Sequence, residues 1–247
     1  MCCQDPCEFL EWDSKHFGLR IGRVSGGRLW PSLLAEIDRW AEERRLDCLY
    51  LLAEPEAETI QLAAAGGFRF VDVRTVLEIS PVPKDLDCDS NIIRPFEPND
   101  VAELRRIAGE SHRNSRFYVD GRFPVAACDE MYRIWIARSA VEMQSSEEVL
   151  VAQHEGRVAG YVSCRFGGQA GAISLIAVDQ HCRGRGIGKT LIRSALARFA
   201  ARGSEAATVV TQLTNLSALR LYEAMGFRIS GAHLWYHRWF LWRSPTQ

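Results

Sequence analysis

The spacing of apolar and polar residues along the chain predicts two consecutive series of helices and strands. In the first series, apolar side chains recur at helical spacing over residues 31–46, and residues 68–79 alternate as a half-buried strand does. An apolar strand and a second helix are predicted between these two elements, at 48–53 and 55–65. Because strands and helices alternate, the first series predicts a small α/β arrangement.

The second series begins near residue 92 and contains more strands than the first. The same criteria predict helices at 98–109, 125–140, 189–203 and 214–227, and strands at 147–153, 158–166, 171–178, 207–213 and 228–242. The polar and aromatic residues 111–124 show no clear periodicity. They predict an irregular loop of the kind that often carries an active site.

A change in composition separates the two series. Residues 81–91 are rich in Pro, Ser and Asp and predict a linker, so we expect an N-terminal α/β domain over 1–80 and a second domain over 92–247. Residues 62–74 and 221–233 resemble each other, since each runs from a helix through Gly-Phe into a strand. Either the first domain is a degenerate copy of part of the second, or the similarity is chance, because glycine-capped helices are common.

The overall composition is that of an ordinary globular protein. The chain has 247 residues, of which 47% are hydrophobic and 25% charged, and its net charge of −1 predicts neither nucleic-acid nor membrane-surface binding. No apolar stretch approaches the roughly 20 residues that span a bilayer. The first residues do not follow the pattern of a secretory signal, so we expect a cytoplasmic protein.

The cysteines and two of the histidines offer a weak metal-binding pattern. Eight cysteines are scattered without a CxxC pair, which indicates free thiols in a reducing compartment. Cys2, Cys3 and Cys7 form a cluster, but no second pair with ligand spacing follows them. His233 and His237 would share one face of a strand, with no evident third ligand. We therefore expect no metal, and leave the role of the three clustered cysteines open.

The stretch RGRGIGKT at 183–190 predicts a phosphate-binding loop between a strand and a helix. It satisfies neither the Walker spacing, because position 183 is Arg, nor the dinucleotide fingerprint, because Gly188 comes one residue early. Three alternating glycines still allow close approach of the backbone, and amides at the start of a helix attract anions. Arg183, Arg185 and Lys189 add positive charge, which suits a diphosphate.

The loop and the elements that follow it resemble the GCN5-related N-acetyltransferases. Arg183, Gly186 and Gly188 match the R-x-x-G-x-G/A loop of that family, and Asn215 followed by ALRLYEAMGF matches its later elements. The resemblance covers residues 92–242. It implies a mixed, mostly antiparallel sheet flanked by helices, acetyl-CoA as cosubstrate, and transfer of its acetyl group to a primary amine.

The resemblance also assigns roles to individual residues. It implies that Tyr222 protonates the departing thiolate, and that Asn215 contacts the pantetheine arm, two helical turns away from Tyr222. The other residues implied to bind the cofactor are Ile176, Ala177, Val178, Arg183, Gly184, Arg185, Gly186, Ile187, Gly188, Lys189 and Thr190. A tyrosine at this spacing on a short helix could otherwise be ordinary core packing.

Within the family, the chain is most similar to members that acetylate an amino sugar carried on dTDP. The similar stretches are 10–18, 115–117, 160–163, 209–226 and 232–239. From the residues alone, Arg116 could bind phosphate while Phe117 and Tyr118 stack on a ring, with Asp120 nearby. A solvated loop without a ligand explains these residues equally well.

Several questions stay open at this stage. The strand at 172–178 has no acidic residue, so His112, Asp120 and Glu130 are the candidates for a general base. The acceptor could instead be another small-molecule or protein amine, or the chain could be a silent acyl-CoA sensor. The final strand looks exposed and could pair across a homodimer.

Overall fold

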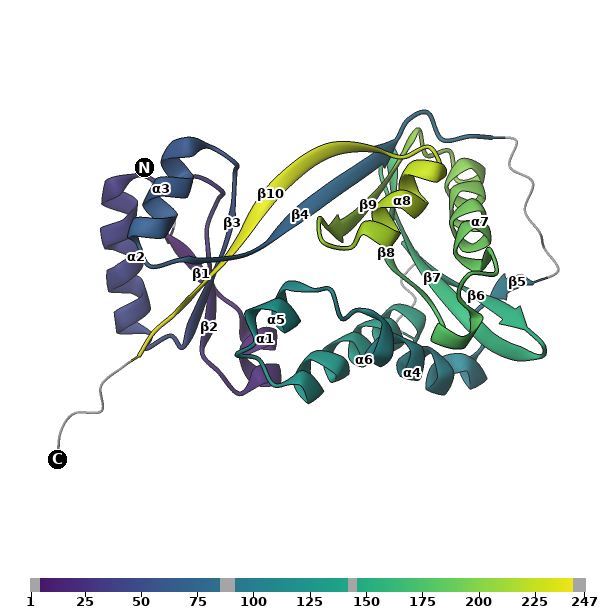
Figure 1. The fold of residues 1–247 in the computed structure, drawn as a ribbon, viewed down its shortest axis with the longest axis horizontal. Helices are drawn as coiled ribbons and strands as arrows, with labels where there is room; N and C mark the ends of the chain where they lie inside the picture. The colour runs from purple at the N-terminus through teal and green to yellow at the C-terminus, as the bar shows by residue number, and fades with distance from the viewer. Residues whose placement is uncertain (1–4, 85–91, 142–145, 242–247) are drawn as a thin grey trace. The chain divides into compact units, whose positions relative to one another are not determined.

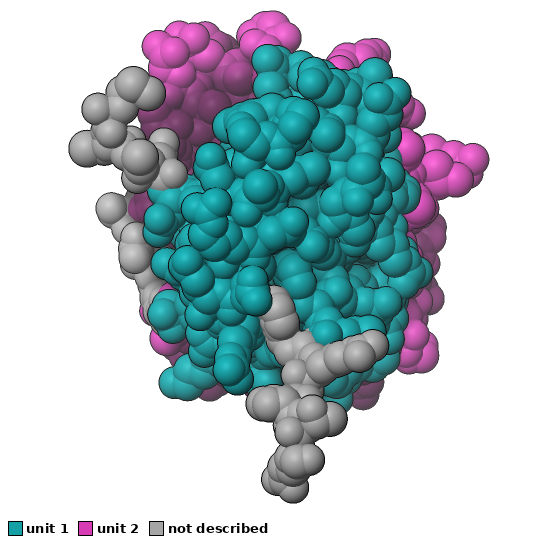
Figure 2. All heavy atoms as spheres, turned by 90° about the vertical axis from the view of Figure 1, so that its left-hand side faces the viewer, with its two compact units in different colours: residues 1–74, 115–127, 232–247 teal, residues 75–114, 128–231 magenta. Residues whose placement is uncertain are grey.

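The computed structural model describes residues 5–84, 92–141 and 146–241. These residues form two compact units, coloured separately in Figure 2. Unit 1 contains residues 5–74, 115–127 and 232–241, and unit 2 contains the remaining described residues. The units therefore cut across the sequential domains that we expect at 1–80 and 92–247. Those two sequential domains stay a prediction.

Unit 1 is built on a sheet with strand order β1-β2-β3-β10-β4. Its elements are β1 (Cys7–Phe9), α1 (Glu11–Phe17), β2 (Ile21–Val24), α2 (Pro31–Glu43), β3 (Cys48–Ala53), α3 (Ala57–Ala65), α5 (Arg116–Asp120) and parts of β4 (Arg69–Ile79) and β10 (Arg228–Trp239). The predicted amphipathic helix is confirmed, since α2 buries Leu33, Ile37 and Trp40. Pro31 opens this helix, where its fixed φ is tolerated best.

The final strand does not lie at an exposed edge, contrary to our expectation. β10 pairs antiparallel with β3 from Leu234 opposite Ala53 to Trp239 opposite Cys48, and β4 is its neighbour on the other side. Its aromatic residues looked exposed in sequence because their partners on β3 are almost 200 positions away. A homodimer formed through a free edge of this strand is therefore excluded.

The stretch 111–124 is not irregular throughout, which corrects a second expectation. It contains the end of α4, and residues Arg116–Asp120 form the short helix α5. Ser115 precedes α5, and Gly121 ends it with a φ of 75°, in the left-handed region that favours glycine. Five residues make little more than one helical turn, so they leave no periodic signal in the sequence.

Unit 2 contains the remaining elements around a sheet with strand order β4-β9-β8-β7-β6-β5. They are β5 (Ile93–Pro95), η1 (Pro98–Asp100), α4 (Val101–Ser111), most of α6 (Val125–Val141), β6 (Glu147–His154), β7 (Arg157–Gly167), β8 (Ala170–Val178), η2 (Gln180–Cys182), α7 (Ile187–Ala201), β9 (Ala206–Gln212) and α8 (Leu216–Ala224). Most neighbouring strands are antiparallel, while β8 and β9 are parallel. This mixed sheet confirms the predicted fold class.

Helices cover both faces of the sheet in unit 2 (Figure 1). On one face α7 buries Leu191, Ala195 and Phe199 against the apolar side chains of β7 to β9. On the other face Tyr161 of β7 meets the end of α4 through His112. Alternation along β7 sends neighbouring residues to opposite faces, so one strand serves both layers.

Glycine allows the close approach of β7 and β8 at one position. A Cβ atom on Gly160 would lie 2.6 Å from the backbone oxygen of Ala177 and 3.3 Å from Leu191. Gly167 lies on the same strand, but a Cβ atom there would meet nothing within 4 Å. The two glycines are therefore a matched pair for testing this constraint.

We expect Gly160→Ala to lower the free energy of unfolding by about 1–3 kcal/mol, because the new methyl group overlaps backbone that cannot move aside freely. Gly167→Ala should change it by less than about 0.5 kcal/mol. Urea denaturation of both variants measures the difference. Equal stabilities would contradict the proposed steric limit.

An ion pair at the start of α4 makes the stability of unit 2 depend on pH. Arg94 binds Asp100 through two hydrogen bonds of 2.6 and 2.7 Å, and Asp100 also accepts from the amide of Glu97. The Arg94 guanidinium holds the pKa of Asp100 below its ordinary value. A lowered folded-state pKa means that this stabilisation is present above the unfolded pKa of about 3.9, and is lost as the pH falls through the folded value.

Asp100→Asn should therefore be less stable than the wild type at pH 7, by about 1–3 kcal/mol. The difference should shrink as the pH is lowered below about 4, because the wild-type carboxylate becomes protonated there. Chemical denaturation from pH 7 to pH 3 checks this. A difference that stays constant over that range would show that the charge of Asp100 is not its source.

Candidate functional site

Two parallel strands of unit 2 separate at a bulge. β8 and β9 pair only over residues 170–173 and 206–209, although β8 continues to Val178. The register between β7 and β8 shifts at Ser163/Cys164, which leaves Ser174 as an extra residue on β8. Beyond this bulge, β8 keeps its pairing with β7, while no described strand pairs with its other edge.

The unpaired edge of β8 contains Ile176, Ala177 and Val178, which we predict to bind the cofactor. Their backbone groups can take up an extended ligand in the way that a sheet edge takes up an added strand. The bulge thus leaves an unpaired edge inside the sheet, where we predict that the cofactor binds. The sequence predicted these residues through family resemblance, while the bulge itself left no signal.

The predicted phosphate loop follows directly from β8. The chain passes through η2 and residues 183–186 into α7, and Gly184 and Gly186 have φ values of 77° and 81°. Both glycines are open on the side where a Cβ atom would lie, so the backbone conformation is what requires them. Gly188 has a different role, since a Cβ atom there would lie 3.2 Å from Leu221 of α8.

The start of α7 presents unused amides beside positive side chains. The first helical bond runs from the amide of Thr190 to the carbonyl of Gly186, so the preceding amides have no partner within the helix. Lys189 is exposed, Arg183 donates to the carbonyl of Val178, and Arg185 lies 3.3 Å from the ring of His154. Such a helix start with added cations favours a diphosphate.

An ion pair that sequence analysis missed braces this loop. Asp179 is buried, and its carboxylate pairs with Arg106 of α4 and accepts from the amide of His181 at 2.8 Å. Its own amide donates to the carbonyl of Ala159 on β7. Burial raises the pKa of Asp179, but the hydrogen bonds from Arg106 and His181 outweigh burial and lower it. An Asp directly after a strand is the signal that could have predicted this cap.

Asn215 and Tyr222 lie on α8, as predicted. The side-chain oxygen of Asn215 caps the helix by accepting from the amide of Ala218 and from the hydroxyl of Ser217. Among the described residues nothing binds its amide nitrogen, which can donate to a ligand. Tyr222 is 3% exposed, and burial raises its pKa well above the ordinary value, so its phenol stays protonated at neutral pH.

The three candidate bases have different surroundings. His112 stacks on Tyr132 with ring centres 4.5 Å apart and lies 3.1 Å from the Tyr161 hydroxyl, and burial lowers its pKa to about 4. Glu130 is bound by Arg105 and Arg133, also in unit 2. Asp120 belongs to unit 1. His112 is thus neutral at pH 7 and free of a carboxylate partner in the described chain.

The predicted acceptor residues belong to unit 1, where α5 presents them. Arg116 is half-buried and Tyr118 is half-buried, whereas Phe117 packs in the interior against Phe17 and Phe123. The Asp120 carboxylate accepts from His237. Phe117 and Asp120 are therefore buried residues of α5, while Arg116 on the same helix is half-buried. Direct contact of Phe117 and Asp120 with an acceptor stays a prediction.

The structure describes part of the weak metal-binding pattern seen in the sequence. No three His, Cys, Asp or Glu residues lie close enough to hold an ion within the described ranges. Cys2 and Cys3 lie outside them, while Cys7 is a buried free thiol whose pKa is raised by burial to about 12. None of the described helices has both the length and the apolar character required to cross a membrane.

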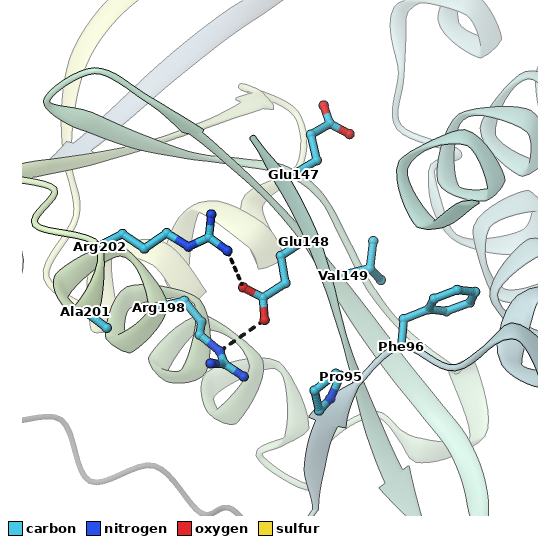
Figure 3. A pocket seen from close by; sticks show the side chains of 8 residues that line it. All are labelled: Pro95, Phe96, Glu147, Glu148, Val149, Arg198, Ala201 and Arg202. Atoms are coloured by element: carbon cyan, nitrogen blue, oxygen red, sulfur yellow. Dashed lines mark ion pairs between the residues drawn. The ribbon is translucent and has the colours of Figure 1, made fainter. Parts of the chain in front are cut away.

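A cavity of about 290 Å³ lies elsewhere in unit 2, at the C-terminal end of α7 (Figure 3). Glu148 lies within it and pairs with Arg198 at 3.2 Å and Arg202 at 3.5 Å. The length of α7, about 20 Å, separates it from the phosphate loop at the other end of the helix. It contains none of the predicted site residues.

Comparison with known proteins agrees with this geometry. The sequence profile of the acetyltransferase (GNAT) family matches residues 103–227, about half of the chain. A putative acetyltransferase of the GNAT family from Novosphingobium aromaticivorans has a similar fold, with a TM-score of 0.56 and 19% identity over 97% of this chain and 91% of that one.

Two curated relatives are informative. The dTDP-fucosamine acetyltransferase of Escherichia coli O6:H1 is 29% identical over 94% of this chain and 97% of its own length. The spore coat polysaccharide biosynthesis protein SpsD of Bacillus subtilis is 29% identical over 59% of this chain, which spans only 50% of that protein. With the family profile covering the diverging strands, the glycine loop and the capped helix α8, the chain belongs to the GNAT family and is an acetyltransferase.

Proposed function

We propose that this acetyltransferase transfers the acetyl group of acetyl-CoA to the amine of a nucleotide-linked amino sugar, such as a dTDP-4-amino-4,6-dideoxyhexose. The observation that carries the proposal is the similarity to a dTDP-fucosamine acetyltransferase along 94% of the chain, which includes the segments of unit 1. A match confined to the family profile would support the chemistry alone and say nothing of the acceptor.

The residues of unit 2 fit acetyl-CoA part by part. The glycine loop with Arg183, Arg185 and Lys189 binds the diphosphate at the start of α7, and Thr190 adds a hydroxyl in the first turn. The unpaired edge of β8 takes up the pantetheine arm, and the free amide nitrogen of Asn215 donates to it. A backbone amide on the same edge polarises the thioester carbonyl.

The reaction then needs the acceptor amine, an acid for the sulfur and an acceptor for the proton of the nitrogen. The neutral amine attacks the thioester carbon, the new C–N bond forms, and the C–S bond breaks as the tetrahedral intermediate collapses. The nitrogen loses one proton to water, and the sulfur gains one. Tyr222 supplies the proton to sulfur, since burial raises its pKa and keeps the phenol protonated.

We expect Tyr222→Phe to lower kcat by about 10²-fold or more, because the leaving thiolate loses its proton donor. The KM for acetyl-CoA should change little. Tyr236→Phe is the matched control, since it also removes a hydroxyl from a buried tyrosine, but one in the core of unit 1. Both variants should unfold near the wild-type temperature.

The acceptor is identified by mass spectrometry after incubation with acetyl-CoA. The panel contains dTDP-linked 4-amino and 3-amino 6-deoxy sugars, an aminoglycoside and a polyamine. A mass gain of one acetyl group on a dTDP-amino sugar, lost in Tyr222→Phe, supports both the acceptor and the acid. Acetylation of the aminoglycoside or polyamine alone would agree with N-acetyl transfer but would reject a nucleotide-linked amino sugar as the acceptor. Tight binding of acetyl-CoA without turnover would favour a silent sensor.

A further prediction concerns the brace at Asp179. Asp179→Asn should raise the KM for acetyl-CoA about 3- to 10-fold with a smaller effect on kcat, because the loop loses its ion pair with α4. Glu110→Gln is the control, since Glu110 pairs with the same Arg106 on the surface of α4 without touching the loop. Steady-state kinetics with varied acetyl-CoA distinguish the two. An equal effect of both variants would assign the result to Arg106 rather than to the loop.

A further inference from the structure

A chain of buried polar groups in unit 1 ends at Arg116. The Asp120 carboxylate lies 2.6 Å from Nδ1 of His237, and Nε2 of His237 lies 2.5 Å from Nη1 of Arg116. The side chains of His237 and Asp120 are 0% and 1% exposed. The indole of Trp239 donates to the same Asp120 oxygen at 3.0 Å. These hydrogen bonds join α5 to β10.

The hydrogen-bonding pattern defines the tautomer and the protonation state of His237. A carboxylate can only accept, so Nδ1 of His237 carries the proton and donates to Asp120. Nε2 is then an acceptor, and the guanidinium of Arg116 donates to it. Burial lowers the pKa of His237 to about 4, which agrees with a neutral ring at pH 7. Arg116 is therefore held at one nitrogen by a neutral partner and keeps its full charge.

Aromatic rings fix the guanidinium from its other sides. Its central carbon lies 4.1 Å from the ring centre of Tyr50, 4.0 Å from that of Phe117 and 4.1 Å from that of Trp235. Contacts of this kind favour a cation and limit the rotamers of the side chain. Arginine has five N–H donors, and His237 accepts a hydrogen bond from one of them. Several donors are left for a ligand.

A carboxylate and a hydroxyl of unit 1 also interact electrostatically with the guanidinium of Arg116. Asp13 on α1 is half-buried and has no ion pair among the residues described. Burial raises its pKa, and the charge of Arg116 is the largest influence that lowers it. Tyr50 is 1% exposed, and burial raises the pKa of its hydroxyl, while the charge of Arg116 and a side-chain contact with Arg116 lower it.

The helix that carries Asp13 is anchored to the segment that carries Arg116. His16 on α1 lies 2.8 Å from the carbonyl of Ala127, and Phe17 stacks on Phe117 and Phe123 with ring centres 5.5 and 4.7 Å apart. Asp13 and Arg116 thus belong to one packed arrangement. The two side chains form no ion pair among the described residues, although the charge of Arg116 acts on Asp13.

We propose that Asp13, Arg116 and Tyr50, beside the ring of Trp235, form a binding site in unit 1 for the hydroxyl groups of the acceptor's sugar ring. The inference rests on the proposed function. Sugar hydroxyls donate and accept at once, so they need a carboxylate and a guanidinium that do not neutralise each other. Trp235 offers an apolar surface for the ring's C–H groups.

A carboxylate and a guanidinium together suit hydroxyl groups, which donate and accept hydrogen bonds. Asp13 and Arg116 carry opposite charges, while His237 between Arg116 and Asp120 is neutral.

Titration calorimetry without acetyl-CoA tests the site directly. The wild type is titrated with dTDP-4-amino-4,6-dideoxygalactose and with dTDP alone, beside Asp13→Asn and Arg116→Lys. We expect each variant to bind the dTDP-sugar at least 10-fold more weakly while its affinity for dTDP changes less than 2-fold. The KM for acetyl-CoA should stay within 2-fold of the wild type. Asp38→Asn is the control, an exposed carboxylate of unit 1 paired with Arg238.

The outcomes are distinct. Folded variants that bind and acetylate the dTDP-sugar as the wild type does would overturn this site and leave the proposed function intact. Equal losses for the sugar and for dTDP alone would move the contact to the nucleotide and also overturn it. A wild type that neither binds nor acetylates any dTDP-amino sugar rejects the proposed function itself. If Arg116→Lys fails to fold, Asp13→Asn decides the question, since Asp13 has no ion pair to lose in the described structure.

Discussion

The separation of β8 from β9 is the constraint on which the active centre depends. An unpaired strand edge inside a sheet leaves backbone donors and acceptors without partners, which is unfavourable unless a ligand or water takes their place. The bulge at Ser174 produces this edge while β7 holds the other side of β8 in register. The protein thus gives up a few internal hydrogen bonds for free backbone groups that, in the proposed function, take up the pantetheine arm.

The glycine loop completes the same arrangement, because it begins where β8 ends. Strand, turn and helix must meet at a defined angle for the free amides of α7 to converge on one anion. Glycines at 184 and 186 provide the turn, and the Arg106–Asp179 pair fixes its first residue against α4 and β7. The sequence motif contains the glycines but not the brace. A motif match therefore describes the shape of the loop without the interaction that keeps it in place.

Most of the secondary structure could be predicted from the sequence, because long periodic segments such as α2 and α7 bury one face each. Asn215 and Tyr222 could be predicted only through family resemblance, since a capped helix with a buried tyrosine is common. α5 and the position of β10 could not be predicted. Five residues leave no period, and the partner of β10 lies almost 200 residues earlier in the chain. His237 was visible as one half of a weak metal pattern, and its role as partner of Asp120 and Arg116 needed the fold.

The network of Asp120, His237 and Arg116 supports the proposal that unit 1 is more than a scaffold for apolar packing. A scaffold could fill this space with apolar side chains, and replacing buried charged networks by apolar groups is often neutral or stabilising. Here every buried atom of the Asp120–His237 pair is instead satisfied, and the last member carries spare donors at a half-buried position. Such a network contributes less to the free energy of unfolding than apolar side chains would, but it orients the guanidinium accurately. The orientation has value only if a ligand uses those donors, so the composition of this core is itself an argument that unit 1 takes part in recognising the acceptor.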